Sequence, residues 1–169
     1  MPSIASRDIR EKEKKRAAEV VRIKLTAEAK LLMVKGEQCS ADNDWHEVRL
    51  AWKEARRATE ALVLPGETAG VLMYEECVYQ IALCYKEEEL SGTYMTELRQ
   101  LEASAQMVST KRRVKVRITE ALGPEEDEEA FRLAREVKRL RKPRGVADSA
   151  YMMCMKILEA LPARLNPGM

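Results

Sequence analysis

Side chains that could do acid–base, nucleophilic or metal chemistry are few in this sequence and poorly placed for it. The 169 residues include one histidine, His46, and four cysteines, none of which forms a Cys-x-x-Cys pair. A Ser or Cys nucleophile needs a neighbouring base, and zinc sites usually need closely spaced Cys and His ligands. The carboxylates come in runs such as residues 125–129, whereas a general acid needs a desolvated site that raises its pKa. The sequence therefore predicts no catalytic residue, no metal and no cofactor.

Clusters of Lys and Arg are the strongest functional signal. Residues 111–117 contain five basic side chains and residues 132–144 contain seven. Such surfaces bind phosphates or acidic proteins, and the alternative is ion pairing inside the chain with the acids at 87–89 and 125–129. Aromatic residues for base stacking are missing among them, which disfavours sequence-specific RNA recognition. The candidate basic patch comprises Lys111, Arg112, Arg113, Lys115, Arg117, Arg132, Arg135, Lys138, Arg139 and Lys142.

The overall composition indicates an all-α protein with a hydrophobic core. Hydrophobic residues make up 46% and charged residues 34%, the formal net charge is +2, and there is one Phe. No apolar run reaches the roughly 18–20 residues that a membrane span needs. The N-terminus lacks an apolar secretion signal, and unpaired cysteines suit a reducing compartment. We expect an intracellular protein, in the cytoplasm or an organelle interior, that is not secreted.

A recurring Glu-Ala-Leu tripeptide indicates where helices end. It occurs at residues 60–62, 120–122 and 159–161, each time just before a proline, which cannot continue a helix. Apolar spacing then predicts about six helices, at residues 6–39, 45–64, 68–89, 91–122, 124–142 and 148–161.

These helices are expected to pair as three antiparallel hairpins, either stacked like repeats or in an irregular bundle. Their turns would lie near residues 41–44, 90–93 and 143–147. Residues 91–122 are interpreted as one long helix bent near Ser109, although the alternation at residues 114–118 could be a short strand. The expected organisation is a charged helical extension at 1–16, a single domain at 17–162 and a tail at 163–169.

The predicted helix at 68–89 is apolar around most of its circumference, which is typical of a central helix. Its Tyr74, Tyr79 and Tyr85 are amphipathic aromatics that suit a groove for a partner. The alternative is that they pack between hairpins with their hydroxyls at the edge. Met153, in a methionine-rich final helix, is a further candidate partner contact.

The first four predicted helices resemble the tetratricopeptide repeat family over about residues 29–108. Leu32 and Gly36 match its large and small packing residues, residues 61–65 resemble its Ala-Leu-x-x-x-Pro ending, and Tyr79, Ala82 and Tyr85 resemble its aromatic-small-aromatic spacing. The resemblance implies stacked helical hairpins that bind a protein segment. A generic stack of α-hairpins or an irregular bundle is the alternative.

Together these patterns predict a non-enzymatic adaptor or structural subunit that contacts other proteins of a multi-subunit complex. The alternative is an RNA-associated subunit of a ribonucleoprotein, in which the basic patch contacts phosphate. A helical-bundle enzyme is the least supported of the three.

Overall fold

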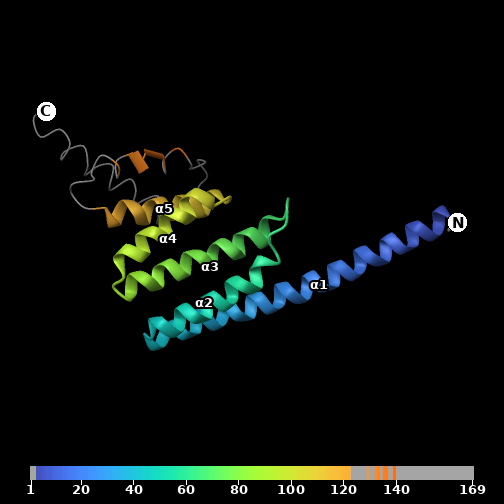
Figure 1. Ribbon diagram of the computed structural model, residues 1–169, viewed down its shortest axis with the longest axis horizontal. Helices are drawn as coiled ribbons and strands as arrows, with labels where there is room; N and C mark the ends of the chain where they lie inside the picture. Colours follow the sequence, from blue (N-terminus) through green and yellow to red (C-terminus); the bar gives the residue numbers. More distant parts are fainter. Residues whose placement is uncertain (1–2, 123–128, 130–131, 134, 137–138, 140–169) are drawn as a thin grey trace, which may run out of the picture. The chain divides into compact units, whose positions relative to one another are not determined.

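The computed structural model describes residues 3–122, 129, 132, 133, 135, 136 and 139, and over these residues the chain is helical with no strand, as predicted. The elements are α1 (Ile4–Cys39), a short 3₁₀ turn η1 (Ser40–Asp42), α2 (Trp45–Glu60), α3 (Thr68–Glu87), α4 (Ser91–Ser104) and α5 (Val108–Ala121) (Figure 1). Residues 129, 132, 133, 135, 136 and 139 are also helical. The predicted final helix, the turn at 143–147 and the tail at 163–169 lie outside the described residues.

The chain divides into two compact units, residues 1–77 (unit 1) and residues 78–169 (unit 2). The division falls inside α3. Each unit has its own packing and is described by itself.

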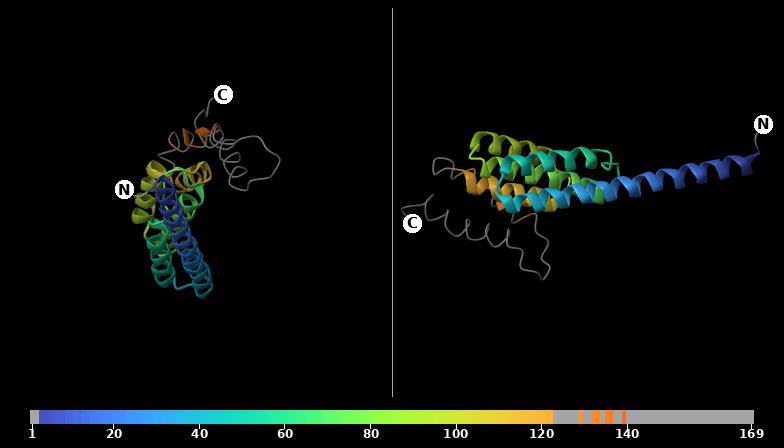
Figure 2. Two further views of the ribbon diagram at one scale, coloured as in Figure 1. Left: turned by 90° about the vertical axis from the view of Figure 1, so that its right-hand side faces the viewer. Right: turned by 90° about the horizontal axis from the view of Figure 1, so that it is seen from below.

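Unit 1 is built on the contact between α1 and α2, which lie side by side in both views of Figure 2. The turn between them falls where the sequence predicts it: Asn43 adopts a left-handed conformation at φ 55°, and the Asp44 carboxylate accepts a hydrogen bond from the Glu47 N–H at 3.2 Å. Gly36 faces Trp52 so closely that a Cβ atom there would lie 2.7 Å from the indole ring. The missing side chain at Gly36 is what allows the two helices to approach.

The connection from α2 to α3 is held by a second close approach. α2 ends at Glu60, before the predicted end at residue 64, and Gly66 turns the chain at φ 80°. Leu62 is buried, and a Cβ atom at Gly70 would lie 1.8 Å from its carbonyl oxygen. Gly70 therefore lets the start of α3 lie directly against this turn.

Unit 2 has one apolar core to which three helices and residue 133 contribute. Its buried members are Tyr79, Ala82, Tyr94, Leu98, Leu101, Ala105, Val114, Ile118 and Leu133. α4 and α5 lie side by side, and their apolar faces meet in this core (Figure 1).

The prediction of one long helix over residues 91–122 is wrong. The chain is extended at Ala105 and again at Met107, so α4 and α5 are separate helices. In one continuous helix, at about 100° per residue, Leu98 and Leu101 would lie opposite Val114 and Ile118. Because the chain reverses, both apolar faces are buried in one core. The alternative of a strand at residues 114–118 is also wrong, since these residues belong to α5.

Candidate protein-interaction surfaces

The N-terminal part of α1 has little packing within unit 1. The helix is 36 residues long, yet Ala29 and Gly36 are its only buried residues. From Ile4 to Val21 every residue except Ser6 is exposed, and this part extends beyond α2 (Figure 2). The charged N-terminal segment that the sequence indicates is therefore a helix that projects from its own unit.

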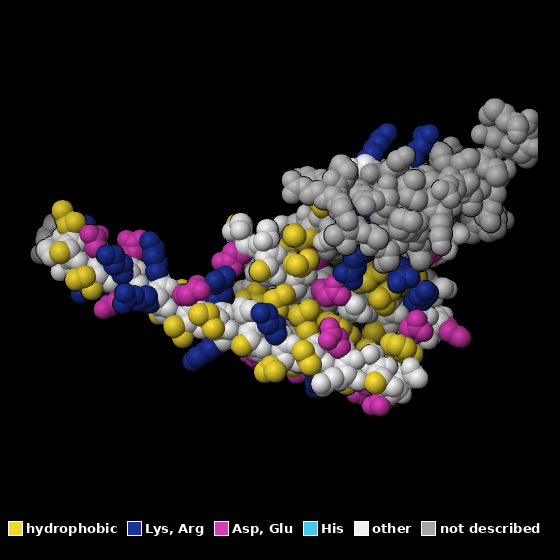
Figure 3. Space-filling model, turned by 180° about the vertical axis from the view of Figure 1, so that it is seen from behind, with side chains coloured by type: hydrophobic (Ala, Val, Ile, Leu, Met, Phe, Trp, Pro, Cys, Tyr) yellow, Lys and Arg dark blue, Asp and Glu magenta, His cyan; other side chains and the backbone are white. Residues whose placement is uncertain are grey.

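A stripe of apolar side chains runs along α1 on the side away from α2. Its members, which we call the outward face, are Val20, Ile23, Ala27, Leu31 and Val34. Their spacing of three, four, four and three residues keeps them on one side of the helix, opposite the buried Ala29 and Gly36. Leu31 is 72% exposed and Ile23 is 58% exposed. Figure 3 shows hydrophobic side chains lying among charged ones along the projecting helix.

Apolar spacing in the sequence indicates a different stripe, with Ala18, Val21, Leu25, Ala29, Leu32, Gly36 and Cys39, of which only Ala29 and Gly36 are buried, and it does not single out the outward face. The signal was present, because the outward residues repeat with helical spacing just as the inner ones do. α2 packs against the side of α1 that carries Ala29 and Gly36, and the residues of the outward face are exposed.

A cavity of about 350 Å³ lies beside the outward face, within unit 1. Ile23 and Ala27 line one side of it, and Leu62 and Met73 are among the residues that line the rest. Arg22 and Glu67, also in the lining, form an ion pair at 3.0 Å. The apolar strip is thus continuous with a hollow that has both apolar and charged walls.

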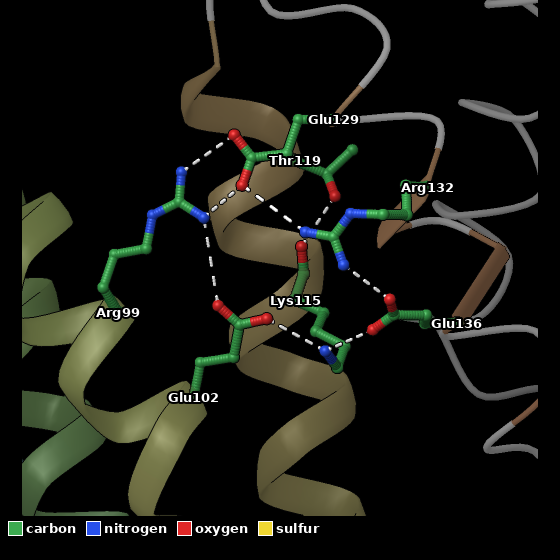
Figure 4. Close-up of polar contacts among 7 residues, drawn as sticks. All are labelled: Arg99, Glu102, Lys115, Thr119, Glu129, Arg132 and Glu136. Carbon is green, nitrogen blue, oxygen red and sulfur yellow. Dashed lines mark hydrogen bonds and ion pairs between the residues drawn. The ribbon is translucent and has the colours of Figure 1, made fainter.

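The basic residues of unit 2 are organised differently, in a network with carboxylates (Figure 4). Lys115 donates hydrogen bonds to Glu102 at 2.9 Å and to Glu136 at 2.6 Å, and its side chain is only 12% exposed. Arg132 pairs with Glu136 at 2.6 Å and with Glu129 at 3.6 Å. Arg99 donates to both carboxylate oxygens of Glu129, so the network joins α4 and α5 to residues 129, 132 and 136.

The pKa shifts in this network follow from its ion pairs. The hydrogen bond from Lys115 lowers the pKa of Glu136, and the hydrogen bonds from Arg99 lower the pKa of Glu129. Burial acts to lower the pKa of Lys115, but its bonds to Glu136 and Glu102 outweigh burial and raise it. All three groups are therefore held in their charged forms.

Tyr79 lies in the core of unit 2, at 5% exposure, rather than on a groove surface. Its hydroxyl accepts a hydrogen bond from Arg117 Nε at 3.0 Å, and the Arg113 guanidinium lies 4.0 Å from the ring centroid. The alternative given for this tyrosine, core packing with a polar edge, describes it correctly. Two of the predicted basic residues are thus engaged by a tyrosine of the same unit.

The other predicted site residues are spread over both units. Tyr74 and Tyr85 are half-buried on α3, and a partner contact at either stays a prediction. Lys111 and Arg112 are half-buried on α5, while Arg135 and Arg139 are exposed. Lys138, Lys142 and Met153 lie outside the described residues.

The remaining side chains that could react are cysteines and one histidine in the described part of the chain. Cys77 and Cys84 are buried free thiols, Cys39 is a half-buried one, and burial raises the pKa of Cys77 to about 11. His46 is exposed in the first turn of α2 and contacts Arg49. Among the residues the structure describes, no group of His, Cys, Asp and Glu could hold a metal ion, and no helix is long and apolar enough to span a bilayer.

Comparisons with known protein families, with curated proteins and with solved structures found no match for this chain.

Proposed function

We propose that the protein is a non-enzymatic interaction subunit that binds other proteins within a larger assembly. The observation that carries this proposal is the outward face of α1. Five apolar side chains on one side of a projecting helix form a continuous strip, whereas single exposed apolar residues are common on any surface.

The free energy available from covering this face supports the proposal. Burying a Val, Leu or Ile side chain contributes roughly 1.5–3 kcal/mol relative to leaving it exposed. Leu31, Ile23 and Val20 are more than half exposed, so a partner that covers them gains much of this contribution. The cavity beside Ile23 and Ala27 would add further apolar contact.

The RNA-associated alternative is less well supported. Phosphate binding needs cationic side chains that are not already neutralised. Lys115, Arg117 and Arg132 each form ion pairs with carboxylates of unit 2. Binding to RNA at low salt that weakens steeply as salt is added would revive this alternative.

Affinity purification with matched variants tests the proposal. The tagged full chain is compared with Ile23→Glu/Leu31→Glu, which places charges on the outward face, and with Leu64→Glu/Leu90→Glu, which changes two exposed leucines elsewhere. We expect the same co-purifying proteins with the wild type and the control, and their loss with the outward-face variant. Equal recovery with all three chains, each shown by circular dichroism to be folded, would contradict the proposal.

A further inference from the structure

The apolar residues of the outward face are spaced symmetrically about Ala27, which binding to an unrelated protein would not require. Val20 and Val34 lie seven residues on either side of Ala27, and Ile23 and Leu31 lie four residues on either side. Reversing the direction of the helix therefore reproduces the same order of large apolar side chains around a small central one. Two identical helices related by a two-fold axis require this self-complementarity.

The polar residues that end the strip follow the same symmetry. Arg16 and Gln38 lie eleven residues on either side of Ala27 and are both exposed. In an antiparallel pair with the axis at Ala27, each would meet the other across the two copies. Ala27 itself would meet its own counterpart, and its small side chain permits the 8–10 Å axis separation of closely packed helices.

Charge complementarity independently favours this pairing. The segment 10–16 carries five basic and two acidic residues, and Glu11 is already paired with Lys15. The segment 37–44 carries three acidic residues and no basic one. An antiparallel arrangement centred on Ala27 brings these two segments together twice, once at each end of the pair. A parallel arrangement would place each segment beside its own copy and lose this attraction.

The outward face is also accessible to a second copy without disturbing unit 1. It lies on the side of α1 opposite Ala29 and Gly36, which pack within the unit, so α2 stays in place. The segments that would overlap, residues 15–39 of each copy, are helical throughout and span roughly 37 Å.

We propose that a second copy of this chain occupies the outward face, with the two α1 helices antiparallel and the two-fold axis at Ala27. This inference rests on the proposed function, since it names one partner for the same surface. The projecting N-terminal part of α1 then lies beside the α1–α2 turn of the other copy.

Sedimentation equilibrium of the purified full chain, in reducing buffer at low salt, tests the association. We expect a species of twice the 19.3 kDa chain mass. Leu31→Glu should weaken its formation by at least about tenfold, because two charges would be buried in an apolar contact, while Leu64→Glu should leave it unchanged. A monomer at all concentrations, or a dimer that Leu31→Glu does not weaken, would overturn the inference.

Cysteine cross-linking tests the orientation. Ala27→Cys should form a disulfide between copies on mild oxidation, beyond any background of the wild type. Val20→Cys should not, because its counterpart would lie about 21 Å away along the helix. Equal cross-linking at both positions would show parallel pairing and overturn the antiparallel arrangement.

The two proposals fail in distinguishable ways. If the chain is a monomer but loses co-purifying proteins when Ile23 and Leu31 are changed, the interaction function stands and self-association is wrong. If the chain dimerises as described but recovers no other protein, the subunit function within a larger assembly is wrong and the pairing stands.

Discussion

Units 1 and 2 differ in how far their apolar and charged side chains are packed within the unit. Among the described residues, ten large hydrophobic side chains of unit 1 are exposed, seven of them on α1, whereas in unit 2 these are only Leu90 and Val108. Unit 2 has a shared apolar core and places Lys115 between two carboxylates of its own. Unit 1 leaves one side of its longest helix uncovered. Among the described residues, the apolar and charged side chains of unit 2 thus meet partners in the same unit more often than the apolar side chains of α1 do.

The largest expected effect on stability is at the close approach inside unit 1. Gly70→Ala would place a Cβ atom 1.8 Å from the Leu62 carbonyl oxygen, so the turn or α3 must move. We expect a loss near the upper end of the roughly 1–3 kcal/mol typical of overpacking, measured by urea unfolding.

Gly92→Ala is the matched control for this change, since its added Cβ meets no atom within 4 Å beyond its chain neighbours and the adjoining backbone of its own helix. Alanine is favoured over glycine in helices by up to about 1 kcal/mol, so this variant should keep or gain stability. A loss at Gly92 equal to that at Gly70 would show that the close approach to Leu62 is not the cause.

The next prediction compares the stability lost when one ion pair is removed from each unit. Lys115→Met leaves Glu102 and Glu136 facing each other without their shared cation, and we expect a loss of about 2 kcal/mol in the free energy of unfolding. Lys35→Met removes an exposed ion pair with Glu54, at 3.5 Å, and should lower the free energy of unfolding by roughly 0–1 kcal/mol. Equal losses in thermal unfolding would mean that unit 2 gains no special stability from its network.

A smaller loss of stability is expected at Tyr79, which lies in the core of unit 2 and contacts Arg113 and Arg117. Tyr79→Phe keeps the ring under Arg113 but removes the hydroxyl that accepts from Arg117, at an expected loss of about 1 kcal/mol. If Tyr79→Phe unfolds at the same urea concentration as the wild type, the hydrogen bond from Arg117 does not contribute to the stability of unit 2.

Acid should weaken unit 2 through its paired carboxylates. Ion pairing holds the pKa of Glu136 and Glu129 below the ordinary value of 4.5. A lowered folded pKa contributes stability above pH 4.5, and this contribution is lost as the pH falls through the folded values. We expect Glu136→Gln to flatten the fall in melting temperature below about pH 4.5. A Glu136→Gln curve parallel to that of the wild type would contradict this assignment.

Local signals in the sequence predicted the first half of the fold well. The periodic apolar residues, the Asp44 cap and the Pro65-Gly66 stop were enough to place α1, α2 and α3 within a few residues of their observed bounds. The break between α4 and α5 was missed because it contains no Gly or Pro. The shift of the apolar residues from one side of the helix to the other, between Leu101 and Val114, was the available signal.

The candidate surfaces were harder to predict than the helices. Whether Lys115 binds phosphate or pairs internally depends on Glu102 and Glu136, which come near it only after the chain reverses. The outward face of α1 has clear periodicity, but the sequence does not say which of two apolar stripes α2 covers. That choice follows from the contact between Gly36 and Trp52.

Hydroxyl-radical footprinting of the associated protein tests the contrast between the units most directly. The full chain is labelled as purified with its partners and again after these have been dissociated. We expect Ile23, Leu31 and Val34 to be protected in the associated sample, while the labelling of Leu90 and Val108 in unit 2 stays the same. Unchanged labelling of Leu31, together with protection confined to unit 2, would contradict this expectation.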